Sequence, residues 1–200
     1  MSVDLGYALQ GRGGQAFSWI DTAGGVKWSA LPAGNFPLMP PGQWTGLASG
    51  SFLLSTPFAV TAGQKLTVIA ILATAYYQPY YDVGFALLVQ GSQVAQVLFA
   101  LRPDNVDQNG DMPGAIVFYA KPSAGVTETS IKQGPAMVVL DGITYGPPVN
   151  AGSGQVSTVV TAASTPPAGT YQLLFGMFNT NDSVDITRPS ALIVQYVDVR

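Results

Sequence analysis

The chain has 200 residues, of which 48% are hydrophobic and only 10% are charged, with 23 glycines and 15 prolines. This composition excludes a disordered chain and predicts one globular domain, or at most two small ones, with a buried core. Only 8 side chains are basic and 11 are acidic, for a formal charge of -3, so nucleic acid, which needs a basic surface, is excluded as a partner.

Residues 1–50 are the first predicted element, an extended arm with short strands that packs on the domain behind it. Glycines and the proline-rich stretch Leu31–Gly42 interrupt any periodicity here. Trp19, Trp28 and Trp44 all lie in this arm, and burial of one indole removes on the order of 200 Å² from water. We therefore interpret the tryptophans as anchors of the arm, with ligand binding as the alternative.

Residues 51–200 are the second predicted element, a β-sandwich domain. Short apolar segments alternate here with gaps that hold Gly, Pro, Asn or Asp, a pattern typical of strands, and no segment predicts a helix. The nine predicted strands are Ser51–Val60, Lys65–Ala73, Val83–Gln90, Gln93–Leu101, Ala115–Tyr119, Ala136–Leu140, Gln155–Thr161, Thr170–Phe178 and Ala191–Val199.

Three connections between these strands are short and contain glycine, namely Thr61–Gln64, Gln90–Gln93 and Pro166–Gly169. Glycine permits the positive φ that tight turns between antiparallel strands need. The predicted fold class is therefore all-β, an antiparallel β-sandwich of jelly-roll character with an extended N-terminal arm.

The predicted strands are apolar on both faces, as Thr170–Phe178 illustrates. One face carries Tyr171, Leu173, Phe175 and Met177, and the other carries Gln172, Leu174, Gly176 and Phe178. A two-layer sandwich normally leaves the outer face of each sheet polar and wet. The arm, long loops or neighbouring copies must cover the second face, and the low charge favours copies for at least part of it.

Four tyrosines gather around Pro79 at the end of an apolar strand. They are Tyr76, Tyr77, Tyr80 and Tyr81. Tyrosine combines a large rigid contact area with a hydroxyl, so it suits a protein interface or stacking against sugar rings. The alternative is structural, with two rings in the core and two over a sheet edge.

Oxygen-bearing side chains alternate around Gly110 in a partial match to a calcium-binding loop. They are Asn105, Asp107, Asn109 and Asp111. The match is partial because Ile116 occupies the position of the bidentate glutamate, and Asn109-Gly110 equally favours a tight turn without an ion. A second oxygen-rich stretch, Asn179–Asp185, has the same two interpretations. No cofactor other than calcium is expected.

The absence of histidine and cysteine excludes most catalytic and metal centres. The chain cannot form a Ser-His-Asp or Cys-His nucleophile, a His or thiolate zinc site, an iron–sulfur site or a disulfide. A pair of carboxylates of the glycosidase type remains, but Glu128 is the only glutamate, and most aspartates lie in predicted turns. We therefore predict that the protein is not an enzyme.

Neither a secretory signal nor a membrane span is predicted. The segment from Met1 to Gln15 is polar and glycine-rich, and it places an acid before any base. The longest apolar runs, Leu66–Ala75 and Ile116–Ala120, fall short of the roughly 20 residues of a spanning helix. We expect either a mature fragment with an added Met or a chain that leaves a cytoplasm by assembly or lysis.

Five strand-like pieces carry a resemblance to a known family. They are Phe58–Leu66, Tyr81–Leu88, Val97–Arg102, Gly169–Gly176 and Ser190–Val197. Under half of the chain is similar in this way to the β-sandwich modules of bacterial surface proteins called choice-of-anchor or PEP-CTERM-type domains. The resemblance implies a non-catalytic jelly-roll sandwich without a defined ligand. The signal peptide and C-terminal anchor of that family are not seen, so surface attachment is not part of the expectation.

Together these features predict a structural or assembly subunit of a larger particle, such as a capsid decoration or tail protein of a virion. Its partners would be other protein subunits, with a homo-oligomer as the expected form, in a virion or another extracellular assembly. The alternative is a secreted glycan-binding β-sandwich module, in which the four tyrosines supply a stacking surface.

Overall fold

The protein is described from a computed structural model. The residues it describes are 9–10, 16–21, 26–27, 47–74, 82–104, 115–133, 138–140, 143–145, 156–180 and 190–200. Within these ranges the chain forms strands and turns and no helix. The prediction of an all-β fold is confirmed.

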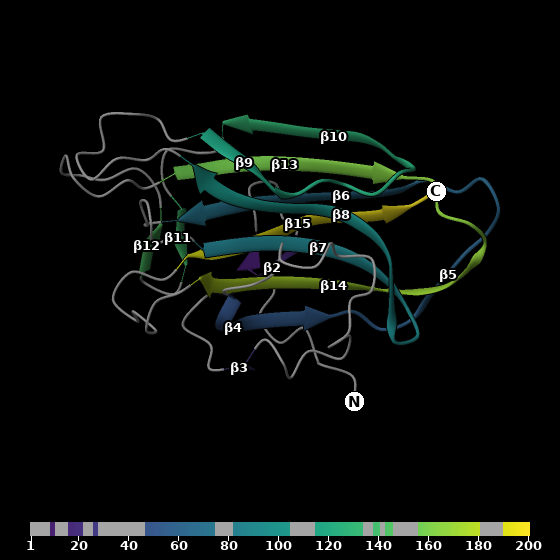
Figure 1. Ribbon diagram of the computed structural model, residues 1–200, viewed down its shortest axis with the longest axis horizontal. Coiled ribbons are helices and arrows are strands. Elements are labelled where there is room, and N and C mark those ends of the chain that lie inside the picture. The colour runs from purple at the N-terminus through teal and green to yellow at the C-terminus, as the bar shows by residue number, and fades with distance from the viewer. Residues whose placement is uncertain are drawn as a thin grey trace.

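The described strands form a six-stranded sheet, a seven-stranded sheet and a separate two-stranded hairpin. In chain order they are β1 (Leu9–Gln10), β2 (Ala16–Asp21), β3 (Val26–Lys27), β4 (Leu47–Leu54), β5 (Phe58–Val60), β6 (Leu66–Thr74), β7 (Asp82–Gln90), β8 (Gln93–Asp104), β9 (Ala115–Ala120), β10 (Val126–Gln133), β11 (Val138–Leu140), β12 (Ile143–Tyr145), β13 (Val156–Ser164), β14 (Gly169–Thr180) and β15 (Ala191–Val199). The strands of both sheets run along the long axis of the molecule (Figure 1).

The strand order is that of a jelly roll. The six-stranded sheet has the order β1-β2-β15-β6-β13-β10, and the seven-stranded sheet has the order β3-β4-β14-β7-β8-β9, with β5 also paired to β14. The eight central strands of the two sheets divide into two sets of four, β2-β15-β6-β13 and β4-β14-β7-β8. Neighbouring strands in each set pair antiparallel, and the chain passes repeatedly from one sheet to the other. A jelly roll, which has eight strands in two Greek keys, shows this arrangement. The predicted jelly-roll character is therefore confirmed.

All nine predicted strands overlap strands of the structure, but one of them is interrupted. The segment predicted as Ser51–Val60 forms β4 and β5, with exposed residues at Thr56 and Pro57 between them. Ser55 remains attached to β14, because its amide donates to the Leu173 carbonyl at 2.9 Å and its hydroxyl accepts the Leu173 amide at 2.8 Å. The register changes by one residue across this interruption, since Leu54 stands opposite Leu174 and Phe58 stands opposite Tyr171. Pro57, which has no amide hydrogen to donate, lies inside the interruption.

Two of the three predicted glycine turns have the expected backbone. Gly63 has a φ of 83° before β6, and Gly91 has a φ of 62° in the two-residue turn between β7 and β8. The third prediction is wrong, because Gly169 has no positive φ and instead begins β14, opposite Val60 of β5. The chain passes between the sheets at residues 165–168 without a left-handed conformation at Gly169.

The main core lies between the two sheets. Its largest buried side chains come from the inward faces of β6, β7, β8, β14 and β15. They are Leu66, Leu72, Leu88, Leu98, Phe99, Leu101, Leu173, Phe175, Met177 and Leu192. Two buried polar side chains form a hydrogen bond in this interior. The Ser164 hydroxyl of β13 donates to Gln96 Oε1 of β8 at 2.6 Å. This hydrogen bond links the two sheets.

A second buried cluster lies on the outward face of the seven-stranded sheet. Its members are Val83, Phe85, Leu87, Val89, Val94, Val97, Ala100, Leu174 and Phe178. Each of these side chains is 5% exposed or less in the isolated chain. The rings of Phe85 and Phe178 stack with their centroids 6.0 Å apart. The prediction that the strands are apolar on both faces is confirmed for this sheet.

The burial of this outward face corrects one expectation. Neighbouring copies were expected to cover part of the second apolar face, but the face is already shielded within a single chain. A smaller cluster on the outward face of the six-stranded sheet, around Ile71 and Ile193, is buried as well, and Trp19 packs against it. Trp28 and Trp44 lie outside the described residues. Among the described residues only Val197 is a large hydrophobic side chain that is exposed.

Candidate functional site

The strands alternate in direction, so their connections gather at two opposite ends of the sandwich. At the short-connection end the linking residues are 61–65, 91–92, 121–125 and 165–168. At the opposite end, named the loop-bearing end, lie the described strand ends that flank residues 22–46, 75–81, 105–114, 134–155 and 181–189, and the β11–β12 hairpin also lies there (Figure 1). Because loops on a rigid scaffold commonly carry binding residues, the loop-bearing end is the candidate site.

Three predicted segments attach to the loop-bearing end on neighbouring strands. Segment 75–81 leads into β7, segment 105–114 follows β8, and segment 181–189 follows β14. In the seven-stranded sheet β14, β7 and β8 are adjacent, and neighbouring strands lie about 4.8 Å apart. The three attachment points therefore fall within about 10 Å of one another.

The predicted site residues themselves lie outside the described part of the chain. They are Tyr76, Tyr77, Tyr80, Tyr81, Asn105, Asp107, Asn109 and Asp111. Of the second oxygen-rich stretch, only Asn179 has a described side chain. The tyrosine site and both calcium-type loops therefore stay predictions, now with a common location for their attachment.

Buried polar side chains lie beneath these attachment points. Asp82 at the start of β7, Asn179 near the end of β14 and Ser190 before β15 are each 1% exposed or less. Asp82 and Asn179 stand opposite each other in the strand register, on the positions that face the other sheet. Each of the three makes an interaction, so this end of the core is closed by partnered polar groups.

Sequence reasoning missed this buried polar layer. Asp82 had no predicted role, and Asn179 was named only as the first member of an oxygen-rich stretch. The available signal was the alternation of residues along β14. Leu173, Phe175 and Met177 face inward, and Asn179 is the next residue on the same face. A polar residue at such a position marks the place where the core ends.

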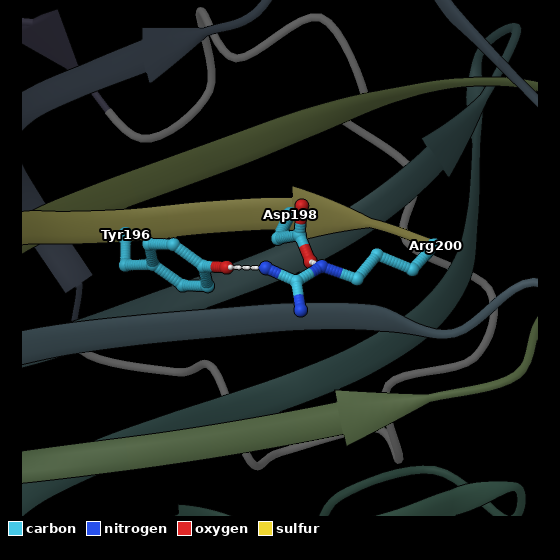
Figure 2. Close-up of polar contacts among 3 residues, drawn as sticks. All are labelled: Tyr196, Asp198 and Arg200. Atoms are coloured by element: carbon cyan, nitrogen blue, oxygen red, sulfur yellow. Dashed lines mark hydrogen bonds and ion pairs between the residues drawn. The ribbon is translucent and has the colours of Figure 1, made fainter.

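A polar cluster on the outward face of β15 lies at the short-connection end, and it was also not predicted. Asp198 Oδ2 lies 2.5 Å from Arg200 Nε, and Arg200 Nη2 donates to the Tyr196 hydroxyl at 3.0 Å (Figure 2). The three side chains alternate along the strand and therefore share one face. The Arg200 side chain is 78% exposed, so the ion pair adds little to stability.

The described residues contain no group of three or more acidic side chains that could hold a metal ion. The backbone of Glu128 lies in β10 opposite Ala163, and its side chain is outside the described set. No helix in the described ranges is long and apolar enough to cross a membrane.

Comparisons with protein-family models, with curated proteins and with solved structures found no match for this chain. The resemblance to choice-of-anchor modules therefore stays a prediction.

Proposed function

We propose that this protein is a non-catalytic structural subunit that assembles with other protein subunits into a larger particle, such as a virion in which it acts as a capsid decoration or tail protein. The supporting observation is the eight-stranded jelly-roll order, an architecture that viral capsid proteins share with lectins. A fold alone does not determine a function, so the composition must separate the two classes. Few charges, no histidine and no cysteine favour a contact surface over a chemical site.

We place the contact surface at the loop-bearing end. Among the described residues, the buried cluster on the outward face of the seven-stranded sheet is shielded within the chain, because each of its members is 5% exposed or less. The four tyrosines attach to the loop-bearing end, between β6 and β7. Tyrosine is enriched at protein interfaces, so Tyr76, Tyr77, Tyr80 and Tyr81 are the proposed contact residues.

A secreted glycan-binding module is the second candidate function. It is favoured by the common attachment of the tyrosine segment and the oxygen-rich segments 105–114 and 181–189 to adjacent strands. Aromatic rings that stack on sugars and oxygen ligands that hold calcium would then lie on one surface. Lectins are among the proteins built on jelly rolls.

Light scattering across a dilution series tests the leading proposal. We expect oligomers whose mass falls on dilution, because association through a specific interface follows mass action. A protein that remains monomeric at every concentration, and that is retarded on a polysaccharide gel in the presence of calcium, would instead establish the glycan-binding candidate.

Serine replacements of the tyrosine pairs test the location of the contact surface. We expect the double variants Tyr76→Ser/Tyr77→Ser and Tyr80→Ser/Tyr81→Ser to associate about tenfold or more weakly, since tyrosines are frequent hot spots. Sedimentation measures the association, and thermal unfolding shows that the fold is retained. The exposed Ser92→Ala variant at the short-connection end is the control. Wild-type association by both double variants would remove the loop-bearing end as the contact surface.

A further inference from the structure

The second half of β15 is an open strand edge among the described residues. On one side β15 pairs with β6 along its length, but on the other side β2 pairs with it only from Ala191 to Val194. The register of β15 shifts between Val194 and Tyr196, and no described strand lies beside it beyond that point. Gln195 and Val197 are exposed there, with Val197 at 43%.

The backbone of this edge is oriented for pairing. The amide and carbonyl of Arg200 bond to those of Lys65, at 3.0 and 2.6 Å, so Arg200 points its polar backbone groups toward β6. In an antiparallel ladder alternate residues point their groups to opposite sides. Val197 and Val199 therefore point their amides and carbonyls toward the open side. No described strand pairs with this row, and the free edge of a sheet is a template for another strand.

We infer that this edge pairs antiparallel with the same edge of a second copy of the chain, across a two-fold axis at Val199. This inference rests on the proposed assembly function and adds a contact to it. In this register Val199 faces Val199 of the second copy, and Asp198 faces Arg200 of the second copy in both directions. Asp198 and Arg200 already pair within each chain, so in this register the two ion pairs form a square of alternating charges, and opposite charges directly across a ladder stabilise it.

Two neighbouring registers are less favourable. An axis at Asp198 places two carboxylates opposite each other, which is destabilising. An axis at Val197 brings Arg200 of the second copy opposite Val194, where Ser18 of β2 already pairs. The selected ladder is short and holds too little area for a stable dimer alone, so it acts as one of several contacts in the assembly.

Single introduced cysteines test the pairing, because the chain contains no cysteine of its own. Directly opposed residues in a ladder have Cα atoms about 5 Å apart, which is within disulfide range. Under mild oxidation we expect Val199→Cys to form covalent dimers about tenfold faster than the control Ala62→Cys, which is exposed in the turn before β6. Asp198→Cys should cross-link no faster than the control.

The outcomes separate this inference from the proposed function. Fast cross-linking of Asp198→Cys would overturn the register. Control-level cross-linking of both variants, while the wild type still forms oligomers in light scattering, would overturn the edge pairing and leave the assembly function standing. If the wild type is monomeric and neither variant cross-links above the control, both proposals are overturned.

Discussion

Replacement of Gly176 by alanine is expected to destabilise the fold by about 3 kcal/mol, at the upper end of the usual cost of overpacking a core. A Cβ atom at this position would lie 2.1 Å from Phe85 Cζ and 2.5 Å from Phe85 Cε1. Phe85 is fully buried and stacks on Phe178, so its ring can make room for a Cβ atom only by displacing the side chains packed around it. Urea unfolding measures the loss as a lower midpoint with an unchanged m-value.

A double-mutant cycle tests whether the Phe85 ring is the cause. Phe85→Ala alone should cost about 3 to 5 kcal/mol, because it leaves a cavity in the outward cluster. In the Phe85→Ala/Gly176→Ala variant the added methyl enters that cavity, so the combined loss should be clearly smaller than the sum of the single losses. Additive losses would show that Gly176 is required for another reason.

Gly91→Ala is the matched control for the cost of removing a glycine. Gly91 has a positive φ of 62° and open space around its Cα, so alanine there meets strain and no clash. We expect a loss of about 1 to 2 kcal/mol. If Gly176→Ala costs no more than Gly91→Ala, crowding by Phe85 is not the reason for glycine at residue 176.

The strands could be predicted because each is apolar and bounded by turn residues. Two described strands after residue 50, β10 and β12, were not predicted, and β10 shows the limit of that signal. β10 carries only two apolar residues, Val126 and Ile131, among polar ones, so its sequence predicts an exposed stretch. It forms because β13 offers a free edge, which it pairs from Val126 to Gln133 with one register shift. A strand at the edge of a sheet owes its structure to a partner distant in sequence.

Apolar residues on both faces of a strand could also be predicted, but their cover could not. Leu174 and Phe178 point outward from β14, and composition alone suggested that a second molecule would shield them. Burial inside one chain depends on which segments the fold brings over the sheet, and a one-dimensional pattern contains no such information. The few charges of this sequence therefore reflect two outward clusters as well as the central core.

The residue types of the candidate site could be predicted from the sequence, but their position in the fold could not. The tyrosines and the Asn and Asp runs stand far apart in the sequence, and only the order β14-β7-β8 shows that their strands are neighbours. The edge of β15 that no described strand covers was beyond prediction for the same reason. Its existence depends on β2 leaving β15 after Val194, which is a fact of register.

Replacement of Gly50 by alanine is the second substitution with a large expected effect, and its cause differs from that at Gly176. A Cβ atom on Gly50 would lie 2.0 Å from the Met177 carbonyl oxygen and 2.7 Å from Phe178 Cα, so the obstacle is the backbone of β14. No side chain can be shortened to make room. The β4–β14 pairing, in which Gly50 stands opposite Phe178, must shift or separate.

We expect Gly50→Ala to cost at least about 3 kcal/mol and to resist rescue. Adding Phe85→Ala should give losses that sum, because the added methyl meets backbone that this truncation leaves in place. Urea unfolding of the single and double variants provides the comparison, and hydrogen exchange of the β4 amides shows where the structure opens. If Gly50→Ala has the same urea midpoint as the wild type, then β4 lies farther from β14 than the pairing of Gly50 with Phe178 implies.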